Sequence, residues 1–178
     1  VSSVAIGYSA AYYNTGNYNV AIGEGALSGT STNGADRNVA IGRQSMHNAT
    51  SAAENVMIGY KAGYAGTTAK WNTAVGTDAM GNMTSASGNT VIGYQAGIGL
   101  TTGTNNVFVG QTAGYNETGD YNIFVGHRAG EGGSGEPDTL RSVFIGYLSG
   151  YRQSGASYNV AVGSQTFQGA DFSGGSNV

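Results

Sequence analysis

The stretch Asn89-Thr90-Val91-Ile92-Gly93 decides the fold, because the chain repeats this five-residue phrase ten times. Each copy begins with Asn or Ser and ends with a glycine, which we call the closing glycine. The mean spacing between closing glycines is (163 − 7)/9, or about 17 residues. A repeat of this kind is typical of a solenoid, in which each coil packs only on its neighbours. The closing glycines are Gly7, Gly23, Gly42, Gly59, Gly76, Gly93, Gly110, Gly126, Gly146 and Gly163.

The three residues before each closing glycine have the composition of a β-strand. We count positions from the closing glycine, so that Val91 is at minus two. The minus-three and minus-one positions hold only Val, Ile or Thr, the β-branched residues that favour strands. The minus-two position is never polar, and it lies on the opposite face because side chains alternate along a strand. A strand that is apolar on both faces is expected to be buried on both faces.

We therefore expect the minus-three and minus-one rows to fill the coil and the minus-two row to face another chain. A thin coil buries little apolar surface by itself, which predicts an obligate homo-oligomer. Three chains are expected, because three-fold closure leaves no sheet edge open around the axis. The candidate trimer contacts are the largest minus-two residues, Met57, Val91, Phe108, Phe124 and Phe144.

The residues after each closing glycine predict turns. The plus-three position is always small, which indicates either a crowded inner corner or a second, thinner strand. The plus-four position is often Gly, as in Gly114 and Gly130, where a Cβ would clash in a tight bend. With 32 glycines in the chain, we do not expect long helices, because glycine disfavours a helix interior. The sequence thus predicts an all-β parallel solenoid of about ten 17-residue coils in one repeat domain, residues 1–178, cut from a longer fibre at the start of an eleventh coil.

Composition excludes several partners. The net charge is −3 and no cluster of Lys or Arg occurs, which argues against nucleic acid. No run of 18 apolar residues occurs, so we expect no membrane insertion by this segment. The absence of cysteine is compatible with a surface fibre and does not settle the compartment.

The sequence gives little support to catalysis. His47 and His127 lie in different coils at different positions, so we predict no catalytic residue, no cofactor and no enzyme activity. Glu131, Glu136 and Asp138 offer oxygen ligands for Ca²⁺, but they lack alternating acidic spacing. We favour a solvated acidic loop and predict no metal site.

Ligand recognition has two candidate features. Eleven of the twelve tyrosines and the single tryptophan recur at fixed positions and should form rows along the rod, either as a receptor-binding surface or as a ladder that stabilises the stack. The longest insertion, Glu131 to Arg141, should project as a loop. The candidate ligand-binding residues are Trp71, Tyr121, Glu136, Asp138, Arg141, Tyr147 and Tyr151.

The phrase Val4-Ala5-Ile6-Gly7-Tyr8-Ser9-Ala10 resembles the head repeats of trimeric autotransporter adhesins, the YadA-like heads. Later copies such as Asn106 to Gly114 look more like variant repeats of phage tail fibres and other trimeric bacterial fibres. The resemblance implies a left-handed β-roll, three chains, and a position outside the cell.

We expect an extracellular adhesin segment that binds a glycan, protein receptor or matrix ligand, at the cell surface or in a virion tail. The alternative is a receptor-binding segment of a phage tail fibre. A fibre-borne polysaccharide-degrading enzyme comes third.

Overall fold

The computed structural model describes residues 2–29, 33–133, 139–152 and 157–169. These residues form ten strands of three residues each and no helix. Every strand is the triplet before a closing glycine, so the strand prediction is confirmed. The strands are β1 (Val4–Ile6), β2 (Val20–Ile22), β3 (Val39–Ile41), β4 (Val56–Ile58), β5 (Thr73–Val75), β6 (Thr90–Ile92), β7 (Val107–Val109), β8 (Ile123–Val125), β9 (Val143–Ile145) and β10 (Val160–Val162).

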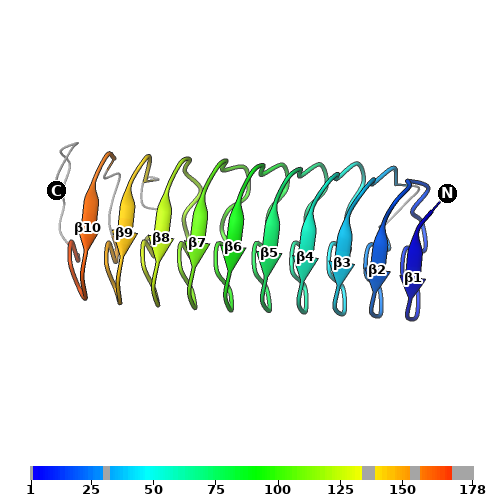
Figure 1. The fold of residues 1–178 in the computed structure, drawn as a ribbon, viewed down its shortest axis with the longest axis horizontal. Coiled ribbons are helices and arrows are strands. Elements are labelled where there is room, and N and C mark those ends of the chain that lie inside the picture. Colours follow the sequence, from blue (N-terminus) through cyan, green and yellow to red (C-terminus); the bar gives the residue numbers. More distant parts are fainter. Residues whose placement is uncertain (1, 30–32, 134–138, 153–156, 170–178) are drawn as a thin grey trace.

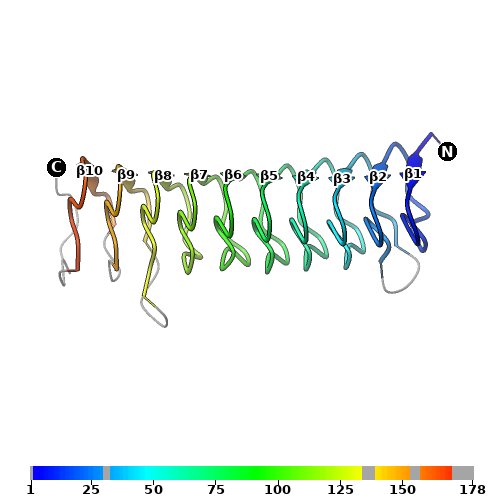
Figure 2. The ribbon, with the colours of Figure 1, turned by 90° about the horizontal axis from the view of Figure 1, so that it is seen from below.

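All ten strands lie in one parallel sheet in the order of the chain. Equivalent residues pair, as Val4 does with Val20 and Ile6 with Ile22. Figure 1 shows the strands side by side along a rod, with β1 and β10 at opposite ends. Figure 2 shows that the segments between strands return on one side of the sheet. A strand spacing of about 4.8 Å makes the sheet roughly 45 Å long. The predicted parallel β-solenoid is confirmed.

The minus-two row lies inside the coil, which corrects the predicted orientation of the strands. Every minus-two side chain from β2 to β9 has an exposed fraction of 0% within a single chain. The minus-three and minus-one rows face outward instead, and Ile92 and Ile123 are each 41% exposed. The prediction that the minus-two side chains contact another subunit was therefore wrong for all five candidates, which were Met57, Val91, Phe108, Phe124 and Phe144.

A ladder of buried asparagines explains this orientation. Asn89 stands at minus four, on the same strand face as Val91 at minus two. Its Oδ1 accepts hydrogen bonds from the backbone N–H and from Nδ2 of Asn106, at 2.9 and 3.0 Å. Its Nδ2 donates to the carbonyl of Gly103 at 2.9 Å. Because a buried amide is costly without partners, the asparagine must face the inside of the coil, where backbone groups can satisfy it.

The closing glycines sit at the sharp bend after each strand. Their φ angles run from +126° at Gly7 to +144° at Gly93, a region that glycine alone enters readily. A Cβ at Gly7 would also lie 2.7 Å from the carbonyl carbon of Gly23 in the next coil. The small plus-three residues, such as Ala96 and Ala113, are fully buried, so this position is the crowded inner corner of the turn.

In most coils the large interior side chain comes from one of two positions, minus two or plus four. Where minus two is alanine, plus four is usually large, as Leu27, Met46 and Met80 show, and these three side chains are fully buried. Where minus two is large, plus four is glycine, and a Cβ on Gly114 would lie 2.5 Å from Cε2 of Phe108. The clash expected at these glycines is confirmed. The minus-two and plus-four side chains therefore occupy the same interior space.

Candidate functional site

The outward face of the sheet is a continuous apolar strip. Its minus-three and minus-one rows hold only Val and Ile, apart from Thr73 and Thr90. Three residues per strand give a width of about 10 Å, so the strip covers roughly 450 Å². That area is comparable to the largest apolar patches that soluble monomers expose, which are often functional.

Aromatic side chains line both edges of this strip. Tyr18, Trp71, Tyr121 and Tyr158 stand where the strands begin, and each is more than half exposed. All four have positive φ angles between 58° and 61°, so the chain turns sharply just before the buried asparagine. Tyrosines at plus one stand where the strands end, and they are Tyr8, Tyr60, Tyr94 and Tyr147.

Arg141 lies between two of the tyrosines on the first edge. Its guanidinium carbon is 5.3 Å from the ring centre of Tyr121 and 5.6 Å from that of Tyr158. Its Nη1 also donates to the hydroxyl of Tyr158 at 3.0 Å. These distances suit cation–π contacts, which are worth about 0.5–1 kcal/mol at exposed sites.

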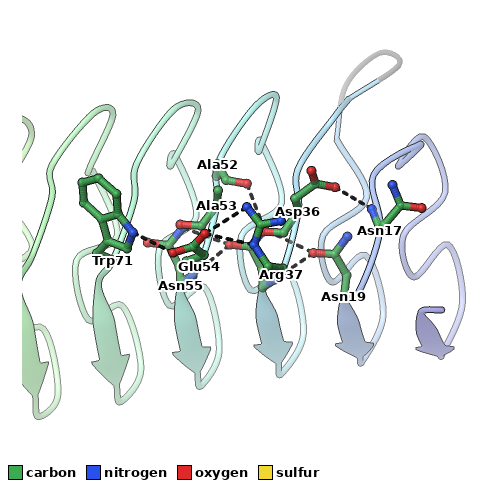
Figure 3. Close-up of polar contacts among 10 residues, drawn as sticks. Asn17, Asn19, Asp36, Arg37, Ala52, Ala53, Glu54, Asn55 and Trp71 are labelled. Carbon is green, nitrogen blue, oxygen red and sulfur yellow. Dashed lines mark hydrogen bonds and ion pairs between the residues drawn. The ribbon is translucent and has the colours of Figure 1, made fainter. Parts of the chain in front are cut away.

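A second polar group lies on the same edge (Figure 3). Glu54 accepts a hydrogen bond from Nε1 of Trp71 at 2.7 Å and one from Nε of Arg37 at 2.9 Å. The bonds from Trp71 and then Arg37 lower the pKa of the Glu54 carboxyl below its ordinary value, because they favour the ionised form. The indole N–H of Trp71 is thus occupied, while 62% of the residue stays exposed.

On the opposite edge, Arg128 joins the turn after β8 to the following coil. Its Nε and Nη2 bond Glu131 at 2.7 and 2.9 Å, a bidentate ion pair. Nη2 also donates to the hydroxyl of Tyr151 at 2.9 Å, and the guanidinium lies 4.6 Å from the centre of that ring. The hydrogen bonds to Glu131 raise the pKa of Arg128 above its usual value. Next to this pair, His127 stacks on Tyr147 with ring centres 5.4 Å apart.

This edge contains a hollow of about 390 Å³. Three successive turns line it, those after β6, β7 and β8. The lining combines aromatic rings, side-chain amides and the Arg128–Glu131 pair, and its members include Tyr94, Gln95, Gln111, Tyr115, His127 and Arg128.

The predicted ligand residues do not form one site. Arg141 contacts Tyr121 on the edge where strands begin, whereas Tyr147 and Tyr151 belong to the edge where strands end. Trp71 lies in a separate group with Arg37 and Glu54. Glu136 and Asp138 lie outside the described residues.

Sequence reasoning missed the hollow. The available signal was the plus-one row, in which Gln111 stands between the rings of Tyr94 and His127. Tyr158, which stands one repeat after Arg141 at the same position and contacts it, was not among the candidate ligand-binding residues.

Each histidine stacks on a tyrosine of the following coil, His47 on Tyr64 and His127 on Tyr147. Within the described ranges, no three acidic or histidine side chains gather closely enough to hold a metal ion. No helix long and apolar enough to cross a bilayer occurs in the part of the chain that the structure describes.

Comparison of the chain with protein-family models, with curated proteins and with solved structures gives no match.

Proposed function

We propose that this chain is a segment of an extracellular homotrimeric fibre that binds a cell-surface, glycan or matrix ligand and has no catalytic activity. The apolar strip along the strand face carries the proposal. The strip runs the whole length of the described rod. Burying its Val and Ile side chains against another chain removes apolar surface from water, which is favourable.

The strip supplies the subunit contact that the buried minus-two row cannot supply. Its minus-three and minus-one rows differ, so in a three-fold assembly one row of each chain packs on the other row of the next chain. The aromatic residues on the edge where the strands begin widen the contact, because aromatic side chains are enriched in interfaces; they are Tyr18, Trp71, Tyr121 and Tyr158. Left-handed winding belongs to the same proposal and follows the resemblance to adhesin heads.

The alternative is a receptor-binding segment of a phage tail fibre. The coils with Phe108, Phe124 and Phe144 favour it, because these copies look like the variant repeats of such fibres.

The test is the mass of the protein in solution. Sedimentation equilibrium at micromolar concentration should give three times the single-chain mass of 18.0 kDa. The double variant Ile92→Glu/Ile123→Glu places two charges per chain in the strip and should give monomers or aggregates.

Thr68→Glu is the matched control, because Thr68 is exposed and lies outside the strands. It should remain a trimer. A folded wild-type chain that sediments with the mass of a single chain would contradict the proposal.

A further inference from the structure

The hollow at the ends of β6, β7 and β8 lies between two aromatic rings of the plus-one row. In the plus-one row, Tyr94 and His127 stand on either side of Gln111, which is exposed and much less bulky than a tyrosine ring. Figure 1 shows these three strands as immediate neighbours, so the three side chains lie in consecutive coils. The smaller side chain of Gln111 therefore leaves a space between the rings of Tyr94 and His127. The His127 ring forms one wall of this space and is held in place by stacking on Tyr147.

The two charged residues beside the hollow, Arg128 and Glu131, neutralise each other in an ion pair. Glu131 takes both the Nε and Nη2 bonds of Arg128, and Thr112 donates a further hydrogen bond to it at 3.3 Å. Arg128 is also held by Tyr151. Since displacing a bidentate ion pair is costly, these groups do not offer a free charge to an incoming anion. The site therefore favours a neutral ligand.

The groups that remain suit a sugar. The exposed ring of Tyr94 and the half-buried ring of Tyr115 can lie against the C–H face of a pyranose, as aromatic residues are large and rigid contact surfaces. Gln95 and Gln111 each carry two N–H donors and one carbonyl acceptor, a pattern that matches neighbouring hydroxyls. A volume of 390 Å³ is at the small end of ligand clefts and holds about one or two sugar rings.

We propose that this hollow binds a neutral hexopyranose unit of a surface glycan, with the sugar face on the tyrosine rings and its hydroxyls bonded to Gln95 and Gln111. The inference rests on the proposed function and narrows its ligand to one chemical class and one place. In a trimer three hollows stand at one height, so three weak contacts combine into higher avidity.

The first measurement uses the wild-type oligomer and defined sugars. Saturation-transfer NMR should detect methyl galactoside, methyl glucoside or methyl mannoside, and a glycan array should show binding to at least one neutral hexose-terminated glycan. Sialylated and sulfated glycans should not be preferred. Binding of anionic glycans only, or of an unstructured peptide library but no sugar, would overturn the assignment.

Two variants then locate the site. Tyr94→Ala removes one ring, and Gln111→Tyr extends the aromatic row into the hollow, where Tyr60 and Tyr147 show that the position accepts tyrosine. Each should weaken sugar binding at least tenfold. Tyr60→Ala is the matched control, because Tyr60 occupies the same row in a coil that does not line the hollow, and it should leave binding unchanged.

The outcomes separate the two proposals. A variant trimer of unchanged mass and melting temperature that binds sugar as well as wild type overturns the site, while the fibre proposal stands. A wild-type trimer that binds none of the sugars or glycans also overturns the site. A monomeric wild type that still loses sugar binding in both variants overturns the trimer and keeps the site.

Discussion

The coils that start at β2 and β3 and those that start at β7 and β8 fill the same interior in opposite ways. The first pair places alanine on the strand and Leu27 or Met46 on the turn, whereas the second places phenylalanine on the strand and glycine on the turn. Both solutions exclude water completely from the residue at minus two. The difference shows that the backbone accepts a large buried side chain either from the strand or from the turn.

The end of the phenylalanine stack supports this interpretation. Phe108, Phe124 and Phe144 stack with ring centres 4.9 and 5.2 Å apart. Phe167 continues the stack at 5.8 Å from Phe144, although it comes from plus four in a coil whose minus-two residue is Ala161. A ring can thus enter the same column from the strand or from the turn.

The largest effect is expected from emptying a phenylalanine coil. Phe124→Ala removes a fully buried ring and should lower the free energy of unfolding by about 3–5 kcal/mol per chain. Reversible denaturant unfolding measures this loss. The double variant Phe124→Ala/Gly130→Leu copies the pairing of Ala21 with Leu27 and should recover a large part of it.

The control for the rescue is Gly130→Leu alone, which should destabilise the protein because its side chain meets the Phe124 ring. If the double variant is no more stable than either single variant, the two positions do not share one space. A loss below about 1 kcal/mol for Phe124→Ala would show instead that the ring is not buried in solution.

A smaller loss of stability is expected from adding a methyl group to a glycine that contacts a buried ring than from emptying a coil. Gly130→Ala puts a methyl group against the Phe124 ring and should cost about 1–3 kcal/mol. Gly34→Ala is the comparison, because nothing lies within 4 Å of a Cβ there and no positive φ opposes it. It should be neutral or stabilise by up to about 1 kcal/mol, by restricting the unfolded chain. Equal thermal shifts for the two variants would contradict the packing described above.

The smallest expected effect concerns the hydrogen bonds that Glu54 makes at the surface to residues of the neighbouring coils. NMR titration of the Glu54 carboxyl should give a pKa below its ordinary value, and Trp71→Phe should bring it back toward that value. Because the folded-state pKa is lowered, this contribution to stability is present above the unfolded pKa and disappears as pH falls through the folded pKa. An unchanged pKa in Trp71→Phe would show that the indole bond is absent in solution, and Arg37→Gln should give a smaller shift.

The sequence predicted the period, the strands and their register, because β-branched triplets at a regular spacing allow few other structures. The prediction that the minus-three and minus-one rows turn inward was wrong. The alternation of side chains along a strand places Val4 and Ile6 on one face and Ala5 on the other, but it does not say which face belongs to the core. Two signals could have decided the question. Asn19 and its equivalents share the minus-two face and need buried partners, and alanine at minus two accompanies a large residue at plus four.

The candidate site was less predictable than the fold. The sequence placed tyrosines in rows, but the contacts within a row depend on turn geometry that propensity does not give. Arg141 and Tyr121 were predicted for one site and do meet. Tyr147 and Tyr151 belong to the other edge, because a strand and a sharp bend separate the residue before the asparagine from the residue after the closing glycine.

The asparagine ladder also determines how the rod responds to force. Asn72 Oδ1 accepts hydrogen bonds from the backbone N–H and from Nδ2 of Asn89, its equivalent one coil away. The backbone bonds of the sheet also join neighbouring coils, as the bond from the Thr73 N–H to the Asn89 carbonyl does. These bonds run along the rod, so tension applied to its two ends pulls neighbouring coils apart. The bonds between one pair of coils then break before those of the next pair. Every detached coil of about 17 residues, such as the one from Asn72 to Asn89, releases about 60 Å of extended chain. A rod built in this way lengthens stepwise under load, and the coils that remain attached keep their structure.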